Sequence, residues 1–342
     1  MAALRRSFHH PSVDLTETSI LITGGTGSFS RAFARRLMSG SLPRRVVLLS
    51  RDEQKQQSMA DEFKQDFPEA VDRLRFFIGD IRDMNRLELA MRDINIVVHT
   101  AALKIIPVAE YNPFECILTN VHGIENLVKV ALRCGVSKVI SLSTDKAVNP
   151  INLYGASKLA ADKIVVAANN LSGLDGPIFS VVRYGNVFGS RGSIVPLLQR
   201  CVSSGAKSVP ITDPRMTRFW ITLEQGVSFV LSSLALMAGG EIFIPKLPSM
   251  RITDLAEVIA PGLGHKFIGI RPGEKLHECL ISADESRATV ELDDRFVIVP
   301  PIPQWFDGHL QDLGGRPVVE GFQYSSDSNT EWLEASTLAD WL

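Results

Sequence analysis

Apolar residues in the first half of the chain follow two alternating patterns. Short, nearly continuous apolar runs rich in β-branched residues are separated by segments in which apolar residues recur with a helical period. Continuous apolar runs are typical of strands buried on both faces of a sheet. The predicted strands are Ser19–Thr23, Val46–Ser50, Leu74–Ile78, Ile94–Thr100, Val139–Ser143 and Phe179–Tyr184, and the helical segments are 30–38, 113–135 and 154–171. This alternation predicts right-handed crossovers and an α/β fold with a doubly wound parallel sheet.

The pattern loosens after about residue 190. Proline and glycine become more frequent, the periodic stretches shorten, and only residues 241–245 still resemble a core strand. We therefore expect a Rossmann-like, nucleotide-binding domain over residues 1–190. A smaller C-terminal α/β portion over residues 191–342 is expected to bind the substrate, partly interleaved with the first domain.

Composition limits the classes of partner. The 342 residues are 45% hydrophobic, which is enough for a sizeable core. The 36 basic and 38 acidic residues give a net charge of −2, so we expect neither nucleic acid nor an anionic membrane as a partner. The start lacks an apolar signal segment and no run of about 18 apolar residues occurs, which predicts a cytoplasmic protein. The widely spaced cysteines, which predict neither a disulfide framework nor a metal site, are Cys116, Cys134, Cys201 and Cys279.

A glycine turn follows the first predicted strand, in the stretch TGGTGSFS at 23–30. Such a turn lets the backbone approach a pyrophosphate, whose charge then lies at the positive end of the next helix. The predicted cofactor contacts are Gly24, Thr26, Gly27, Ser28 and Phe29. Ser30 stands where a third glycine is expected, and because it is small we expect it to be tolerated in helix packing. A glycine turn by itself also serves to join strand and helix tightly, so the other loops must decide.

The end of the second predicted strand favours NADP over NAD. An acidic residue there would bind a ribose 2′-hydroxyl, whereas an arginine accommodates a 2′-phosphate. Here Ser50 and Arg51 occupy this place and Lys55 follows. The alternative is that Arg51 and Lys55 belong to the solvated first turn of a helix.

Two further loops complete the predicted cofactor site. Asp80 and Ile81 follow the third strand, where Asp80 would meet the adenine amino group or, alternatively, cap its own turn. Ala101 lies in the stretch HTAA after the fourth strand, where small residues let the backbone lie against the cofactor.

The stretch LSTDKAVNPINLYGASK carries the candidate chemistry. Thr144, Asp145 and Lys146 come just after a strand, and Tyr154 and Lys158 lie four residues apart at the start of a helix. This spacing places phenol and ammonium on one helix face, where Lys158 favours the phenolate and can hold ribose hydroxyls. Tyr154 would then act as a general base on a substrate hydroxyl while hydride leaves for a nicotinamide.

These motifs together resemble the extended short-chain dehydrogenase/reductase superfamily. Within it, the chain closely resembles the inverting UDP-N-acetylglucosamine 4,6-dehydratases that open pseudaminic acid biosynthesis. The similar stretches include ILITGGTGSF, LSRDEQKQ, GDIRD, HTAALK, EYNPFECILTNVHG, STDKAVNPINLYGASK, RYGNVFGSRGSIVP, MTRFWITLEQGV, GGEIFIPKLPSM and IRPGEKLHE. The departures are Ser30 in place of a glycine, and LKII where a histidine is expected after Lys104.

The resemblance implies a redox-neutral cycle with NADP. Hydride leaves carbon 4 of the sugar, water is lost across carbons 5 and 6, and hydride returns to carbon 6. Tyr154 is implied as the oxidation base, Lys146 as the base at carbon 5, and Asp145 as the acid for the departing 6-hydroxyl. Asp145 must carry a proton for that step, which the adjacent ammonium opposes, so the two form a coupled pair that shares protons. Both Lys146 and Tyr154 are candidates for returning the proton to carbon 5 with inversion.

The resemblance also implies the substrate contacts. Two arginines suit a diphosphate because a guanidinium offers paired donors. Each arginine on its own has an alternative role as a surface or ion-paired residue. The implied set is Lys104, Asn186, Val187, Val195, Arg218, Arg271 and Glu274. His277 and Cys279 are close in sequence, but without further ligands nearby they predict no metal site.

Three alternatives remain at this point. A UDP-sugar 4-epimerase uses the same tyrosine and lysine but needs no elimination acid and base, so Asp145 and Lys146 count against it. A configuration-retaining 4,6-dehydratase is closer, although such relatives often lack a tyrosine at the position of Tyr154. An NADP-sensing module without catalysis leaves Tyr154 and Lys158 unexplained. Extended short-chain relatives are commonly dimers or larger, so we expect a homo-oligomer, either a dimer or a hexamer.

Overall fold

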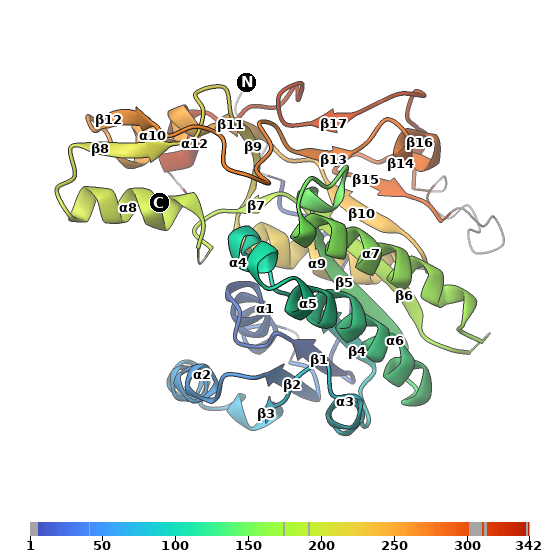
Figure 1. The fold of residues 1–342 in the computed structure, drawn as a ribbon. Coiled ribbons are helices and arrows are strands. Elements are labelled where there is room, and N and C mark those ends of the chain that lie inside the picture. Colours follow the sequence, from blue (N-terminus) through green and yellow to red (C-terminus); the bar gives the residue numbers. More distant parts are fainter. Residues whose placement is uncertain are drawn as a thin grey trace.

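A ten-stranded, mostly parallel sheet forms the centre of the described part of the molecule (Figure 1). The computed structural model describes residues 6–40, 42–173, 175–190, 192–300, 310, 313–339 and 341. Its parallel strands are β1 (Ser19–Thr23), β2 (Arg45–Ser50), β3 (Leu74–Ile78), β4 (Ile96–His99), β5 (Lys138–Thr144), β6 (Ile178–Tyr184) and β10 (Ile242–Pro245). The predicted doubly wound α/β fold is confirmed, with strand ends that lie within two residues of the predicted ones.

The strand order places a switch in chain direction next to the glycine turn. The order β3-β2-β1-β4-β5-β6 means that the chain runs outward in both directions from β1 and β4. Ligands of open parallel sheets bind at this switch, outside the carboxyl ends of the strands. β1 is buried along its whole length, as its unbroken apolar run predicts.

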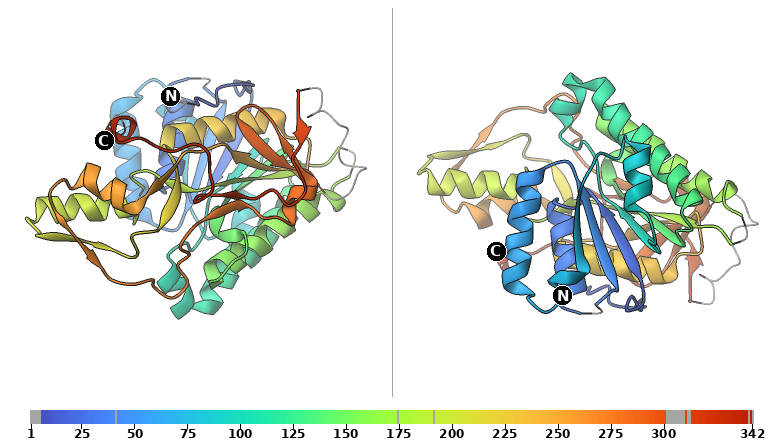
Figure 2. Two further views of the ribbon diagram at one scale, coloured as in Figure 1. Left: turned by 90° about the horizontal axis from the view of Figure 1, so that it is seen from above. Right: turned by 90° about the horizontal axis from the view of Figure 1, so that it is seen from below.

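Helices cover both faces of the sheet. Figure 2 shows α7 and α9 on opposite sides of it. The helices on the α9 side are α1 (Ser28–Met38), α2 (Glu53–Asp66) and α9 (Leu223–Leu236), and those on the α7 side are α3 (Met84–Ala90), α6 (Gly123–Arg133) and α7 (Leu153–Ala167). The predicted helix 113–135 is divided into α5 (Pro113–Ile117), a π-helical turn (Leu118–His122) and α6, and the short α4 (Ile106–Tyr111) precedes it. Among the described helices, none is long and apolar enough to cross a membrane.

The second half of the chain contributes more to the sheet than its sequence pattern predicted. After β10, the strands β15 (Arg295–Ile298), β14 (Thr289–Glu291) and β16 (Arg316–Pro317) extend the sheet in antiparallel fashion. The prediction that only residues 241–245 form a core strand is therefore wrong. These strands are two to four residues long, too short for a recognisable period.

The remaining elements form a smaller layer above the carboxyl ends of the sheet (Figure 1). Part of this layer packs around a separate hydrophobic cluster that includes Leu198, Trp220 and Leu255, whereas β13 and β17 pack against the main core. The strands are β7 (Asn186–Val187), β8 (Ser208–Ile211), β9 (Thr217–Ile221), β11 (Ser249–Arg251), β12 (Gly264–Phe267), β13 (Cys279–Ile281) and β17 (Tyr324–Ser325), and the helices are α8 (Ile194–Ser203), α10 (Ile252–Ile259) and α12 (Ala335–Ala339). The division at residue 190 remains a prediction.

Candidate active site

Two adjoining cavities lie at the carboxyl ends of the parallel strands. The larger has a volume of about 610 Å³ and the smaller about 510 Å³. Gly24, Ala101 and Ala102 line both, so the two cavities meet at the glycine turn. Together they form an elongated site across the switch between β1 and β4, as expected for a dinucleotide and a second ligand.

The glycine turn is shaped by close backbone contacts. Gly24 has a φ of +66°, in the left-handed region that glycine adopts without strain. A Cβ at this position would lie 2.8 Å from Thr100 Oγ1 and 3.0 Å from Ala101 Cα. Gly27 is the N-cap of α1 and supplies no side-chain cap, so the first amides of the helix are available to an anion.

Ser30 fits where the third glycine was expected. Its side chain is fully buried, and its hydroxyl lies 3.0 Å from the carbonyl oxygen of Gly24 and 2.8 Å from Thr100 Oγ1. Thr100 in turn donates to the carbonyl oxygen of Thr23. The serine therefore ties α1 to the turn and to the end of β4, in addition to filling the space.

The smaller cavity collects the predicted adenosine contacts. Its wall includes Thr26, Ser50, Arg51, Lys55, Asp80, Ile81 and Ala101. Arg51 is half-exposed, with Nη1 3.5 Å from Asp80 Oδ2. Asp80 also caps its own turn, since the amide of Arg82 donates to Oδ1. Burial opposes the charged form of Asp80, but hydrogen bonds from Arg82 hold its pKa below the usual value. Asp80 therefore caps its own turn and also lines the cavity, and its contact with the adenine amino group stays a prediction.

Tyr154 and Lys158 both line the larger cavity, from the first two turns of α7. Asn152 begins the helix, because its side chain accepts a hydrogen bond from the amide of Gly155. Burial raises the pKa of the Tyr154 phenol to about 12, although Lys146 and Thr144 lower it in part. Burial also lowers the pKa of Lys158, against the charge of Asp162, and its Nζ donates to the Leu142 carbonyl oxygen at 2.8 Å.

Gly155 lets α7 approach the turn that carries Lys146. A Cβ at Gly155 would lie only 2.2 Å from the carbonyl oxygen of Lys146. The short 3₁₀ turn Asp145–Ala147 therefore packs directly on the first turn of α7. This contact brings Lys146 to the same cavity wall as Tyr154, Lys158 and Thr144.

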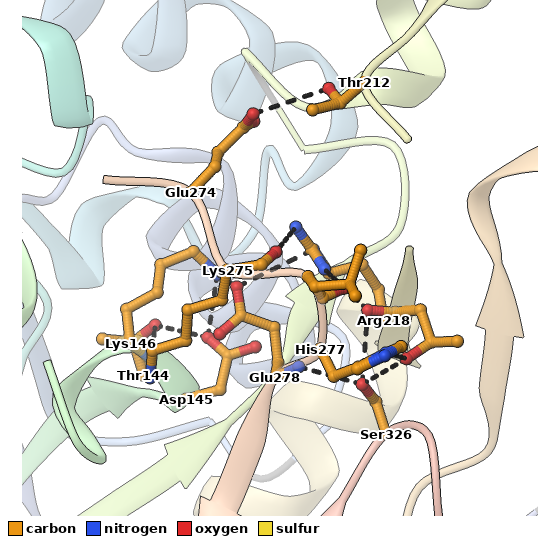
Figure 3. A network of polar contacts seen from close by, with 12 residues as sticks. Thr144, Asp145, Lys146, Thr212, Arg218, Glu274, Lys275, His277, Glu278 and Ser326 are labelled. Carbon is orange, nitrogen blue, oxygen red and sulfur yellow. Dashed lines mark hydrogen bonds and ion pairs between the residues drawn. The ribbon is translucent and has the colours of Figure 1, made fainter. Parts of the chain in front are cut away.

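Lys146 belongs to a cluster of four charges, together with Asp145, Arg218 and Glu278 (Figure 3). Lys146 Nζ lies 2.9 Å from Asp145 Oδ1 and 3.2 Å from Glu278 Oε1, and Arg218 Nε is 3.7 Å from the same Glu278 oxygen. Burial alone would lower the pKa of Lys146, but the two carboxylates outweigh it and raise this pKa. Thr144 Oγ1 donates to Asp145 Oδ1 at 2.9 Å. Asp145 is fully buried, and Thr144 and Lys146 are the members of this group that line the cavity.

Glu278 was missed by the sequence analysis. The stretch RPGEKLHE was interpreted for Arg271 and Glu274, and its last residue carried no recognisable signal. Only the packing of the 271–278 segment against the turn at 145–152 brings it to Lys146. Lys275 Nζ donates to the Val148 carbonyl oxygen, and Asn152 Nδ2 donates to that of Gly273.

The predicted substrate contacts divide into two groups. Five of them line the larger cavity, namely Lys104, Asn186, Val187, Arg271 and Glu274. The side chains of Arg218 and Val195 do not line it. Arg218 donates to the backbone oxygens of Thr217, Lys275 and Leu276, which occupy its guanidinium. Val195 is 1% exposed and lies in the second hydrophobic cluster, because α8 turns this face inward.

The stretch around His277 serves structural contacts. His277 Nδ1 is 2.8 Å from the Thr217 hydroxyl. Burial raises the pKa of the Cys279 thiol to about 11, so it is a thiol rather than a thiolate at neutral pH. Across the described ranges, no three potential ligands gather in a group that could hold a metal ion.

Comparisons with known proteins place this geometry in a family. The family model described as polysaccharide biosynthesis protein matches residues 20–300. A Campylobacter jejuni protein named UDP-N-acetylglucosamine 4,6-dehydratase (inverting) is 53% identical over 94% of this chain and 96% of its own length. A Rickettsia canadensis protein named UDP-glucose 4-epimerase is 37% identical over 82% of this chain and 83% of its own.

A solved structure gives the same result for the fold. The X-ray structure of Pen from Bacillus thuringiensis superposes with a TM-score of 0.85 and 33% identity, covering 96% of this chain and 99% of that one. The resemblance stated from the sequence motifs is thereby confirmed. The chain belongs to the polysaccharide biosynthesis protein family, within the extended short-chain dehydrogenases/reductases.

Proposed function

We propose that this protein is a hydro-lyase that removes water from carbons 5 and 6 of UDP-N-acetylglucosamine, with inversion at carbon 5. The product would be a UDP-4-keto-6-deoxy-L-hexosamine. The observation that carries the proposal is the placement of Thr144, Lys146, Tyr154 and Lys158 on one cavity wall beside the glycine turn. The named Campylobacter jejuni dehydratase, similar over almost the whole chain, supports it.

We propose NADP as the cofactor, with its adenosine part in the smaller cavity. Gly24 and Gly27 line the cavity at the start of α1, and the helix has no side-chain cap, which leaves its first amides for a pyrophosphate. Arg51 and Lys55 line the far end with half-exposed side chains, as a ribose 2′-phosphate requires. When bound, NADP would supply a hydride acceptor at carbon 4 and a hydride donor at carbon 6.

Tyr154 would remove the proton of the 4-hydroxyl during oxidation. The residue is 8% exposed and lines the cavity, so its side chain is buried except toward the proposed sugar site. Because burial raises the pKa of this phenol, neighbouring cations must favour its ionised form. Lys146 already does so, and Lys158 lies one helical turn away on the same wall.

Asp145 and Lys146 would then perform the elimination. Transfer of one proton from Lys146 Nζ to Asp145 Oδ1 gives a neutral amine and a carboxylic acid, without changing the total number of bound protons. The amine takes the proton from carbon 5. The acid supplies the proton with which the 6-hydroxyl departs as water, and Thr144 is the cavity-lining hydroxyl in contact with it. After this step Lys146 is again charged and Asp145 ionised.

The substrate would lie in the larger cavity. Arg271 and Glu274 enter it from one loop, and Asn186 and Val187 enter from β7. The guanidinium of Arg271 is half-exposed and suits a diphosphate. Lys104 lies at the same wall, where it would contact the sugar nucleotide.

We further propose a cytoplasmic homo-oligomer that acts at the start of pseudaminic acid biosynthesis. The proposed contact between subunits is the apolar surface of α4 and α5, on which Tyr111 is 87% exposed and Phe114 82% exposed. Ile105, Val108 and Leu118, close to them in sequence, are exposed as well. Several exposed apolar side chains in one stretch of chain are typical of protein–protein contacts.

Proton NMR of UDP-N-acetylglucosamine in deuterated water, with catalytic NADP and no reductant, tests the proposal. The expected product has a carbon 6 methyl signal, deuterium at carbon 5 and coupling constants of the inverted sugar. A carbon 4 epimer alone would instead support the epimerase activity for which the Rickettsia canadensis relative is named. Unchanged carbon 5 stereochemistry would indicate a retaining dehydratase.

A further inference from the structure

Glu278 is a buried carboxylate beside the proposed base. Its side chain is 2% exposed, Oε1 faces Lys146 Nζ at 3.2 Å, and Oε2 has no hydrogen-bond partner among the described residues. A buried ionised group without full compensation is costly, so its presence calls for an explanation. None of the predicted steps uses it.

The backbone around Glu278 is held firmly. Its amide donates to Ser326 Oγ at 2.9 Å, and the amide of Ser326 donates back to the Glu278 carbonyl oxygen at 2.8 Å. Ser326 is itself fully buried. The carboxylate therefore keeps its place against Lys146 without relying on an exposed loop.

The charged and titratable groups around Lys146 come from four separate segments. Asp145 is on its own turn, Glu278 precedes β13, Arg218 extends from β9, and the Tyr154 phenol comes from α7. Asp145 and Glu278 balance Lys146 and Arg218, so the cluster is neutral as a whole (Figure 3). When the proton passes from Lys146 to Asp145, that pair becomes uncharged, and Glu278 and Arg218 still neutralise each other.

We infer that Glu278 is a positioning residue for the elimination, which holds Lys146 Nζ against Asp145 and keeps the cluster neutral while a proton moves between them. The inference rests on the proposed dehydratase function. It assigns Glu278 no contact with the substrate. Arg218 takes a matching part, as the cation that remains with Glu278 when Lys146 becomes a neutral base.

Glu278→Gln removes the charge and keeps the shape. Loss of a negative charge beside the pair makes both of its protonation steps harder, so each limb of the pH–rate profile moves to lower pH, by about one unit or more. We expect turnover at pH 7 to fall about tenfold or more, because Lys146 Nζ is no longer held against Asp145. KM should change little, because the residues that line the substrate cavity are intact. Glu320→Gln makes the same change in net charge on an exposed side chain and serves as the control.

The measurements are the pH dependence of turnover by NMR for the wild type, E278Q, E278D and E320Q. E278D keeps the charge but shortens its reach, so it lowers turnover while leaving the limbs in place. An E278Q profile with wild-type limbs overturns the inference. If E278Q does not fold, wild-type turnover in E278D overturns it instead. Conversion of UDP-N-acetylglucosamine by the wild type is measured first. If the wild type does not convert it, the proposed function fails, whatever the variants of Glu278 show.

Discussion

Replacing Gly155 by alanine tests how closely α7 must approach the turn that carries Lys146. The new Cβ would lie 2.2 Å from the Lys146 carbonyl oxygen, whereas real Cβ contacts essentially never fall under 3.0 Å. The contact joins the new Cβ to a backbone oxygen, so no flexible side chain can move aside. The turn and the helix must therefore separate by close to an ångström.

The two consequences appear in different measurements. Overpacking costs about 1–3 kcal/mol, but alanine is favoured over glycine inside a helix by about 1 kcal/mol, so the net loss of stability is about 0–2 kcal/mol. Displacing a proposed catalytic group by about 1 Å costs about a hundredfold in rate, which corresponds to about 2.7 kcal/mol. We expect G155A to lose at most about 2 kcal/mol in urea unfolding, to stay folded, and to lose about two orders of magnitude in turnover.

Turnover by NMR and urea unfolding are compared for the wild type, G155A and G173A. The control is matched, because Gly173 has no atom within 4 Å of an added Cβ, and alanine there should change neither quantity. Wild-type turnover in a stable G155A enzyme would refute the argument that this contact sets the position of Lys146.

Four other expectations can be checked with simple variants. Combined Arg51→Ala and Lys55→Ala should weaken NADP binding by calorimetry at least about tenfold and leave NAD binding nearly unchanged. Tyr154→Phe should bind NADP but lose about a hundredfold or more in turnover. Phe243→Ala, at a fully buried position, should lower the free energy of unfolding by about 3–5 kcal/mol in urea. Burial lowers the pKa of His99 to about 3, so between about pH 3 and 6.5 the unfolded chain binds more protons than the folded one, and the free energy of unfolding decreases as the pH decreases. His99→Leu should remove this part of the difference between urea unfolding at pH 7 and at pH 5.

Much of the fold could be predicted because its signals are local. The parallel strands β1, β2, β4, β5 and β6 are mostly buried on both faces and therefore appear as continuous apolar runs, whereas β3 at the edge of the sheet is only partly buried. The glycine turn follows β1, and the stretch containing Tyr154 follows β5. Because the carboxyl ends of parallel strands meet at one edge of the sheet, these segments and the end of β2 were expected to lie close together. The cavities do gather these segments.

The parts that the sequence did not predict depend on contacts between distant segments. Glu278 meets Lys146 only because the 271–278 loop is hydrogen-bonded to the turn before α7. Arg218 was expected to face a diphosphate, yet backbone oxygens of that same loop bind its guanidinium. Val195 lies on the apolar face of α8, which packs into the second hydrophobic cluster. The helical period of apolar residues does not tell whether such a face contacts the core or a ligand.

The same long-range contacts argue that the two halves of the chain form one catalytic unit. β10, from the second half of the chain, pairs with β6, so the first half alone would expose the edge of that buried parallel strand. Without Glu278 and Arg218, Lys146 and Asp145 would also lose the charges that balance them. Because the proposed elimination needs Lys146 to alternate between two protonation states, its chemistry depends on a carboxylate from the second half of the chain. The predicted separation into a cofactor-binding half and a substrate-binding half therefore concerns only the expected ligand contacts, while the proposed proton chemistry needs residues of both halves.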